Sequence, residues 1–532
     1  MREIKTPEQC VRSVMTRLSS ADKMAFASAI VIGLLAHLYV FTNKLYNYDE
    51  LYNTPGNYGV GIENNRWFLE LLGRFSSRTL TGSYSFPWVN GAVSILLLAI
   101  SAMLVVRMFE VKSTLFAGVI GGFMVAFPAV TCMFFFMFTA VYYSVGIFLS
   151  ILAAYFLVRL PKNIFANLLA VLSLACSLGI YQAYFPNAVC LCLLAVILSC
   201  AFEGKERKLS VVVLRGVHYV LALVAGMGLY FILNKVFQRV WATGGSMGSY
   251  QGMDTMGQIT AGEFIDGIKL CYQSFFALGR EGMLYLNPTQ FVVKAFLIIM
   301  LVLVGSALFL LYVYKEDWKK KALMLLGIAL FPVAMFLIYI MAPKAYVYTL
   351  VIYPAVFILI FFVVWVDRYS QVMERYGLLT SIMQWIAVVL SGIILAAYIW
   401  YANGCYMCME YTKYHDMAYF ETMVTQIKSL DGYTDEMQVV FIGDEIEDES
   451  HQMGGLIDKV FAMEGKSETH INSYSRWHLV TKYLGYAPEF GGYEEVQKWM
   501  ANEEVQEMSC YPDDGSIKII DDTIIVKLSE IE

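Results

Sequence analysis

Charged residues are scarce in this sequence. Only 15% of its 532 residues are Asp, Glu, Lys or Arg, whereas soluble domains carry roughly 25%. Hydrophobic residues make up 58% of the chain, and the mean hydropathy is +0.58. A soluble core of this length could not hide so much apolar surface, but a lipid bilayer removes the need to hide it. The composition therefore excludes an ordinary soluble protein and indicates an integral membrane protein.

Positive charge is not in excess either. The formal net charge of −6 argues against a nucleic-acid partner, which calls for a basic face. The sequence has no Walker phosphate loop and no Ser-His-Asp arrangement, and Gly443-Asp444 lacks the glycine pattern of a nucleotide fingerprint. Cys405 and Cys408 have the spacing of a redox or metal pair, but no second pair accompanies them. We therefore expect no metal centre built on cysteine.

Long hydrophobic stretches are abundant. A transmembrane helix needs about 20 mostly apolar residues, and we predict about eleven such helices, with no cleavable signal peptide before them. They fall at 24–43, 89–108, 114–131, 133–157, 164–181, 185–202, 212–234, 291–313, 322–341, 345–365 and 380–402. The third and fourth are nearly continuous, with a turn expected near Pro128 to Phe134. The fold class is therefore an all-α polytopic membrane protein.

Lys and Arg residues predict the orientation of these helices. They concentrate in every second loop, and the short loops between hold almost none. Because cytoplasmic loops carry the excess of Lys and Arg, residues 1–23 are expected in the cytoplasm and 24–402 in the membrane domain. An odd number of spans then places 403–532 outside, together with the long loops 44–88 and 235–290. The protein is predicted to reside in a cell membrane as a multi-pass protein.

Some outer segments have their own periodicity. Residues 64–75 place aromatic and leucine side chains at helical spacing, which predicts an amphipathic helix on the membrane surface. A further helix is expected near 262–277. The acidic tail predicts a small α/β or α+β domain of about 120 residues. Its expected elements are a helix at 414–430, a buried strand at 438–443 and a hairpin at 517–527.

Two adjacent carboxylates, Asp49 and Glu50, follow the first predicted span by a few residues. A carboxylate near the interface can take the proton from a sugar hydroxyl as that hydroxyl attacks. A solvated pair of loop acids accounts for them equally well, because loop acids are common.

Positive charge in the outer loops runs against the usual bias. Arg66 and Arg74 lie in the first outer loop, Lys344 in a very short outer turn, and Arg280 in the second long loop. Arginine grips phosphate with a planar fork and lysine holds it as a point charge, so a lipid phosphate is one ligand for them. The alternative is that these side chains reach for lipid headgroups or anchor the chain at the interface.

Aromatic residues crowd the first outer loop. Tyr48 and Trp67 are candidates for stacking on a sugar ring or a polyprenyl chain, although an ordinary interfacial belt accounts for most of the others. The predicted spans carry very few charges, whereas transporters usually keep ionisable residues inside the membrane. The sequence therefore favours a transferase over a transporter.

The motifs Tyr48-Asp49-Glu50 and Asn65-Arg66-Trp67, with the closing stretch from Tyr511 to Lys518, carry a family resemblance. The chain resembles the type II O-antigen-modifying integral-membrane glucosyltransferases, within the GT-C-like transferases that use polyprenyl-phosphate sugars. The resemblance implies transfer of a hexose, glucose, from a polyprenyl-phosphate donor to a surface glycan of a bacterial cell envelope. It also implies a catalytic acid in the first outer loop. Whether that acid is Asp49 or Glu50 stays open, as does a need for Mg²⁺ or Mn²⁺.

Chemistry outside the cytoplasm agrees with a lipid-linked donor, because nucleotide sugars are not available there. We expect a single displacement in which an acid takes the acceptor proton and Arg or Lys stabilises the departing phosphate. Three alternatives remain. A glycan polymerase or ligase would join oligosaccharide units, a transporter or flippase would move its substrate without covalent change, and a non-catalytic envelope protein would bind a partner through its tail.

Overall fold

The computed structural model describes most of the chain. The described residues are 6–53, 58–80, 85–203, 208–241, 259–278, 289–313, 318–344, 347–444 and 471–530. They divide into two compact units. The membrane unit consists of Met1–Thr42, Gly56–Asn403 and Ala462–Glu464, and the C-terminal unit consists of Asn43–Pro55, Gly404–Phe461 and Gly465–Glu532.

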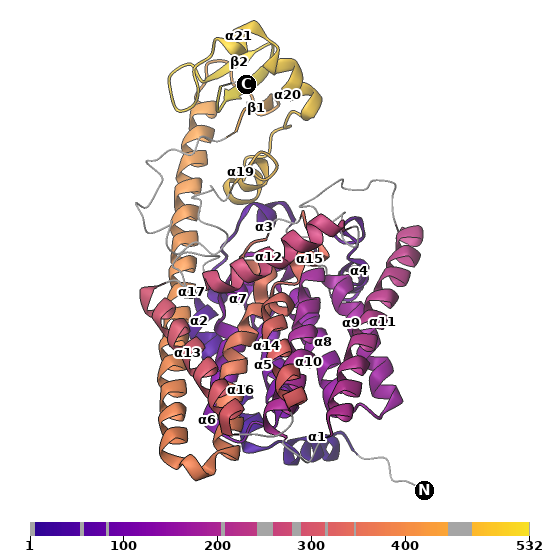
Figure 1. Ribbon diagram of the computed structural model, residues 1–532. Helices are drawn as coiled ribbons and strands as arrows, with labels where there is room; N and C mark the ends of the chain where they lie inside the picture. The colour runs from indigo at the N-terminus through magenta and orange to yellow at the C-terminus, as the bar shows by residue number, and fades with distance from the viewer. Residues whose placement is uncertain are drawn as a thin grey trace. The chain divides into compact units, whose positions relative to one another are not determined.

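The membrane unit is helical throughout its described part (Figure 1). Its first helices are α1 (Pro7–Thr16), α2 (Ser20–Thr42), η1 (Ile62–Asn64), α4 (Trp67–Thr79), α5 (Pro87–Phe109), α6 (Thr114–Ala126), α7 (Pro128–Phe135), α8 (Met137–Arg159), α9 (Ile164–Ile180), η2 (Gln182–Tyr184) and α10 (Phe185–Phe202). They are followed by α11 (Leu209–Trp241), α12 (Ala261–Ala277), α13 (Gln290–Val313), α14 (Trp318–Met335), α15 (Ile338–Met341), η5 (Thr349–Ala355), α16 (Val356–Val372), η6 (Glu374–Tyr376) and α17 (Gly377–Lys428).

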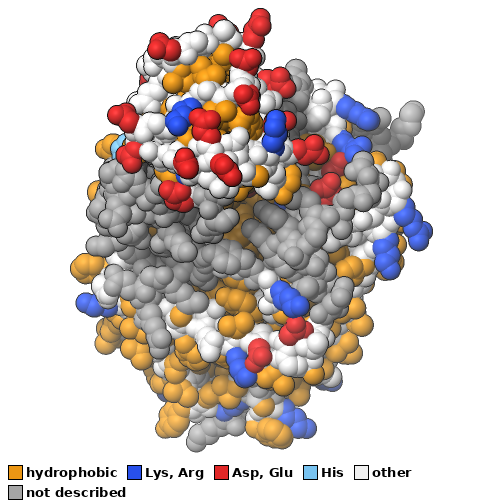
Figure 2. Space-filling model, turned by 90° about the horizontal axis from the view of Figure 1, so that it is seen from above, with side chains coloured by type: hydrophobic (Ala, Val, Ile, Leu, Met, Phe, Trp, Pro, Cys, Tyr) orange, Lys and Arg blue, Asp and Glu red, His pale blue; other side chains and the backbone are white. Residues whose placement is uncertain are grey.

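All eleven predicted apolar stretches fall on helices. In the part of the chain that the structure describes, nine helical segments are long and apolar enough to cross a membrane, and α9 is a shorter apolar helix. The stretch predicted at 322–341 is divided between α14, which contains Pro332, and α15. Large hydrophobic side chains such as Leu35 and Leu221 are exposed on the long helices. In the view from above, Figure 2 shows hydrophobic side chains along the sides and the lower edge of the molecule. The prediction of a polytopic helical membrane protein is therefore confirmed.

The turn expected between the third and fourth spans was placed wrongly. Residues 128–134 form most of helix α7, which begins at Pro128 after a break at Phe127. Proline suits this first helical position because its missing N–H would have no partner there. The chain turns instead at Phe136, directly before α8.

The two helices predicted at 64–75 and 262–277 are present as α4 and α12. Trp67 and Leu69 of α4 are buried, while Phe75 is 60% exposed. A Cβ atom at Gly179 of α9 would lie only 2.7 Å from the Trp67 indole. The first turn of α4 therefore packs against protein, and only its later turns present apolar side chains outward.

Helices α2 and α6 approach each other closely at Gly121. A Cβ atom there would lie 2.2 Å from the carbonyl oxygen of Ala25, and the Ser28 hydroxyl donates to the carbonyl of Gly118 over 2.7 Å. Because a backbone atom cannot move aside as a flexible side chain can, Gly121→Ala should destabilise the membrane unit by about 1–3 kcal/mol. The measurement is thermal unfolding of detergent-solubilised protein. Gly228→Ala is the matched control, since its Cβ would meet nothing within 4 Å, and equal melting temperatures for the two variants would contradict the prediction.

The C-terminal unit contains a three-stranded sheet. Its strands are β1 (Gln438–Ile442), β2 (Ile517–Ile520) and β3 (Thr523–Lys527), in the order β1-β3-β2. β3 pairs with β1 in parallel and with β2 antiparallel, and the turn between β2 and β3 uses Asp521 and Asp522 at positive φ. The predicted strand and hairpin are confirmed. Short helices α3 (Tyr48–Asn53), α19 (Arg476–Leu484), α20 (Tyr493–Met500) and α21 (Glu503–Gln506) complete the described unit.

Helix α17 belongs to both units. Its 52 residues join the predicted span at 380–402 and the predicted helix at 414–430 without a break. Phe420, Met423 and Ile427 on its second half pack into one hydrophobic core with the sheet. Tyr46 and Leu51 lie in the same core, so the segment after the first span folds with the tail. The sequence did not predict this association.

Candidate active site

Helix α3 positions the two candidate acids differently. The side-chain oxygen of Asn47 accepts a hydrogen bond from the backbone N–H of Glu50 over 2.8 Å and so caps the helix. Leu51 is 1% exposed and Glu50 is also 1% exposed, whereas Asp49 is only half-buried. One turn of helix is therefore enough to turn Glu50 inward and Asp49 towards the surface.

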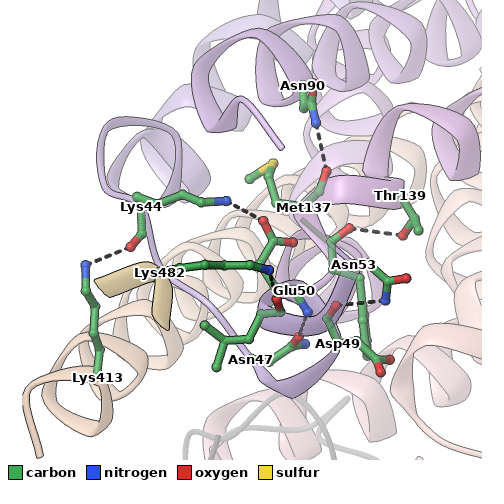
Figure 3. Close-up of polar contacts among 12 residues, drawn as sticks. Lys44, Asn47, Asp49, Glu50, Asn53, Asn90, Met137, Thr139, Lys413 and Lys482 are labelled. Carbon is green, nitrogen blue, oxygen red and sulfur yellow. Dashed lines mark hydrogen bonds and ion pairs between the residues drawn. The ribbon is translucent and has the colours of Figure 1, made fainter. Parts of the chain in front are cut away.

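Glu50 is held by positive charge within the C-terminal unit. The Lys44 ammonium lies 2.5 Å from its carboxylate, and Lys413 donates to the carbonyl of Lys44 (Figure 3). Lys482 lies close by and donates to the carbonyl of Leu51. Burial lowers the pKa of Lys482, and Lys44 lowers it further, while Glu50 acts in the opposite direction. The Glu50 carboxylate is thus part of an ion pair that ties α3 to its surroundings.

Asp49 has aromatic neighbours instead. Its carboxylate accepts a hydrogen bond of 2.9 Å from the hydroxyl of Tyr474. The Tyr474 ring stands edge-on to Tyr48 at 6.1 Å and to Tyr52 at 5.6 Å. Of the two acids, Asp49 is the one that reaches solvent, so it is the better placed to meet a substrate hydroxyl.

His478 on α19 completes this surface. Its ring stacks on Trp477 with centroids 3.5 Å apart and stands edge-on to Tyr52 at 5.4 Å. Burial, and then the nearby Lys482, lower the pKa of His478 to about 4. The imidazole is therefore neutral at neutral pH.

This lowered pKa makes stability depend on pH. The unfolded chain takes up a proton at His478 near its ordinary pKa of about 6.5, whereas the folded chain resists protonation until about pH 4. The contribution of His478 to the stability of the folded protein is therefore fully present above about pH 6.5 and is lost as the pH falls towards 4. We expect His478→Gln to reduce the loss of melting temperature between pH 7 and pH 4.5. A decline identical to that of the unsubstituted protein would contradict the prediction.

The Asn65-Arg66-Trp67 motif lies in the membrane unit, where helix α11 holds its first residue. Asn65 adopts a left-handed conformation with φ of 60°. Its side-chain oxygen accepts hydrogen bonds from Asn234 over 2.8 Å and Gln238 over 2.9 Å, and the Tyr230 hydroxyl donates to its carbonyl over 3.1 Å. Three polar side chains of α11 therefore fix the turn that precedes α4.

The last residue of the motif is held as firmly. The Trp67 indole is 3% exposed and stacks on Phe237 with ring centroids 5.0 Å apart and planes 4° apart. The backbone of Arg66 is therefore held on both sides. Its guanidinium carbon lies 4.7 Å above the ring of Tyr181, whose hydroxyl is 3.4 Å from that of Tyr348. Arg66 is thus a largely buried cation, 8% exposed, on an aromatic surface.

The other predicted cations differ from Arg66. Arg74 forms an ion pair of 2.7 Å with Glu70 and lies over the Trp241 ring, and Glu70 raises its pKa. Lys344 is exposed in the turn after α15, four residues before Tyr348. Arg280 lies outside the described residues.

A family model now places these residues in context. Residues 38–359, more than half of the chain, match the family described as Glucosyl transferase GtrII. The chain belongs to this glucosyltransferase family. No curated protein and no solved structure matches it. The matched range includes α3, the Asn65-Arg66-Trp67 motif and Lys344, so these predicted site residues of the glucosyltransferase lie within the family region.

Two features around the candidate site of this glucosyltransferase were not predicted from the sequence. Glu70 is 6% exposed and accepts hydrogen bonds from the Tyr58 hydroxyl over 2.8 Å and from Arg74; its spacing of four residues from Arg74 was the available signal. The hydrogen bonds from α11 to Asn65 could not be predicted from a local pattern, because Asn234 and Gln238 are 169 and 173 residues away in the sequence. Among the described residues, no three His, Cys, Asp or Glu side chains gather where they could hold a metal ion.

Proposed function

We propose that this glucosyltransferase transfers glucose from a polyprenyl-phosphate donor to a surface glycan, with Asp49 as the general base. The observation that carries the assignment is the contrast on α3. Glu50 is buried in an ion pair with Lys44, whereas Asp49 reaches the surface beside Tyr474. A base must come within hydrogen-bond reach of the proton that it takes, and of these two acids Asp49 meets this requirement.

The proposed reaction is a single displacement. An acceptor hydroxyl oxygen attacks the anomeric carbon of glucose and forms the new glycosidic bond. The bond from that carbon to the phosphate oxygen breaks, and its electron pair leaves with the polyprenyl phosphate. The hydroxyl proton passes to the Asp49 carboxylate. The anomeric configuration is therefore inverted.

Arg66 is proposed to stabilise the charge that develops on the departing phosphate. A preorganised cation in a site of low dielectric stabilises such charge without reorganising first, and the burial of Arg66 over the Tyr181 ring supports this role. Lys344 is a second phosphate ligand in the proposal. Arg74 already pairs with Glu70, and we retain it and Arg280 as weaker candidates. That Asp49 and Arg66 serve the same reaction is part of the proposal.

The aromatic candidates take different roles. Trp67 is stacked inside the membrane unit, so we assign it the positioning of Arg66. Tyr48 lies beside Asp49 on α3 and is proposed to contact sugar. The reaction is proposed to occur on the outer face of the membrane, with the N-terminus in the cytoplasm, since Lys and Arg are concentrated in every second loop between the predicted spans.

The test is transfer by purified protein in proteoliposomes. The donors are polyprenyl-phosphate glucose and, in a parallel reaction, a nucleotide-activated glucose; the acceptor is surface polysaccharide from bacteria that lack the gene. We expect single glucose additions from the lipid donor alone, release of one polyprenyl phosphate per transfer, and an inverted linkage by NMR. Transfer from the nucleotide donor only would overturn the donor assignment, and retention would overturn the single displacement. Addition of whole oligosaccharides would favour a polymerase or ligase.

A further inference from the structure

The C-terminal unit carries a group of aromatic rings near Asp49, three of them exposed and one, Tyr48, half-buried. We call it the aromatic face and define it as Tyr48, Tyr52, Tyr474 and Trp477 with Asp49. Tyr52 is 49% exposed, and Tyr474 and Trp477 are each 39% exposed. Large aromatic side chains on a soluble surface usually mark a binding site when they gather in one place.

Hydrogen bonds from Arg476 and Lys482 hold the helices that carry the aromatic face. Arg476, which is 3% exposed, donates to the carbonyl of Gly443 over 2.9 Å and to the carboxylate of Asp444 over 2.8 Å. Lys482 donates to the carbonyl of Leu51 and so links α19 to α3. All three contacts lie within the C-terminal unit: the two from Arg476 tie α19 to the residues after β1, and the one from Lys482 joins α19 to α3. The rings are therefore presented on a fixed support, which lowers the entropy that binding would cost.

The arrangement of the rings indicates the class of ligand. The plane of the Tyr474 ring stands at 84° to that of Tyr48 and at 88° to that of Tyr52. The group therefore presents both ring faces and ring edges, and it is not a single flat apolar surface. The carboxylate of Asp49 lies among them. A sugar ring combines apolar C–H faces, which stack on aromatic rings, with hydroxyl groups, which donate to a carboxylate. An anionic lipid surface would be repelled by Asp49.

We propose that the aromatic face binds the acceptor glycan and presents one of its hydroxyl groups to Asp49. This inference rests on the proposed function, since Asp49 is the base there. It assigns to the C-terminal unit the recognition of the acceptor. The ion pair between Lys44 and the buried Glu50 then serves to hold α3 in place behind the aromatic face.

The experiment measures binding and transfer separately on the full chain. The probe is unglucosylated surface polysaccharide from bacteria that lack the gene, and its Kd is measured with the protein in nanodiscs without any donor. We expect Tyr52→Ala and Trp477→Ala each to raise this Kd, and the KM for polysaccharide, by roughly tenfold. The KM for polyprenyl-phosphate glucose should stay unchanged. Trp477→Phe, which keeps a ring, should recover most of the affinity.

Tyr493→Ala is the matched control, because Tyr493 is a 79% exposed aromatic residue on α20 of the same unit. A Kd for Tyr52→Ala equal to that of Tyr493→Ala would overturn the inference, and Tyr52 supplies this test even if Trp477→Ala does not fold. The two proposals fail differently. Transfer that persists while both aromatic variants bind polysaccharide normally refutes the aromatic face alone. Ring-dependent polysaccharide binding without transfer from the lipid donor refutes the proposed function alone.

Discussion

Asp49→Asn is expected to lower the rate of glucose transfer by about 10²–10⁴-fold, the usual contribution of a general base. The amide has almost the same shape as the carboxylate and still accepts a hydrogen bond from Tyr474, but it cannot take the acceptor proton. The effect should therefore appear in kcat, with little change in the Kd for polysaccharide. The measurement is steady-state transfer from polyprenyl-phosphate glucose in proteoliposomes.

Glu50→Gln is the matched control for this variant. It makes the same change from acid to amide one residue away, in a side chain that is 1% exposed and paired with Lys44. The substitution removes the buried carboxylate that pairs with Lys44, which is itself 36% exposed, and that also opposes the charge of Lys482, so the cost should fall on stability. We expect a lower melting temperature and a smaller loss of rate per folded molecule than Asp49→Asn shows. The reverse ranking of the two rates would identify Glu50 as the base and contradict the assignment.

Arg66→Lys is expected to reduce kcat by about 10²–10³-fold, the loss typical for removal of one donor that stabilises developing charge. Lysine keeps the positive charge but loses the planar fork and the stacking surface that rests 4.7 Å above Tyr181. A reaction limited by phosphate departure should be sensitive to this change. Acceptor binding should not be, so the Kd for polysaccharide is expected to match that of the unsubstituted protein.

Arg215→Lys on α11 controls for the substitution itself, because Arg215 lies outside the proposed site. Transfer by this variant should equal that of the unsubstituted protein. A rate for Arg66→Lys within twofold of the control would show that no specific guanidinium contact is made in the transition state. Melting temperatures of both variants separate a loss of chemistry from a loss of fold.

The spans could be predicted because a bilayer imposes a local rule. About 20 consecutive apolar residues are needed to cross it, and that requirement can be seen in each stretch by itself. The hairpin was equally local, since Asp521 and Asp522 supply the positive φ angles that a tight turn requires. The turn at Phe136 was mislocated because α6, α7 and α8 form one nearly continuous apolar run, in which hydropathy changes too little to locate a break.

The roles of the neighbouring acids could not be separated in the same way. Asp49 and Glu50 have the same chemistry and adjacent positions, and their difference arises from which side of a single helical turn meets the core. That core brings Tyr46 and Leu51 together with Phe420 and Ile524, from opposite ends of the chain. Likewise, the turn at Asn65, directly before Arg66, is held by Asn234 and Gln238 on a distant helix.

The sequence by itself determined the membrane class, the helical spans, the acidic tail with its hairpin, and the presence of acids and cations in the loop after the first span. Each of these depends on residues that are close together in the chain. Only the tertiary structure decided that residues 43–53 fold with the tail, that Glu50 is buried while Asp49 is half-buried, and that Trp67 packs inside the protein. These outcomes depend on packing between segments far apart in sequence, where burial and ion pairing are set by partners that no local pattern identifies.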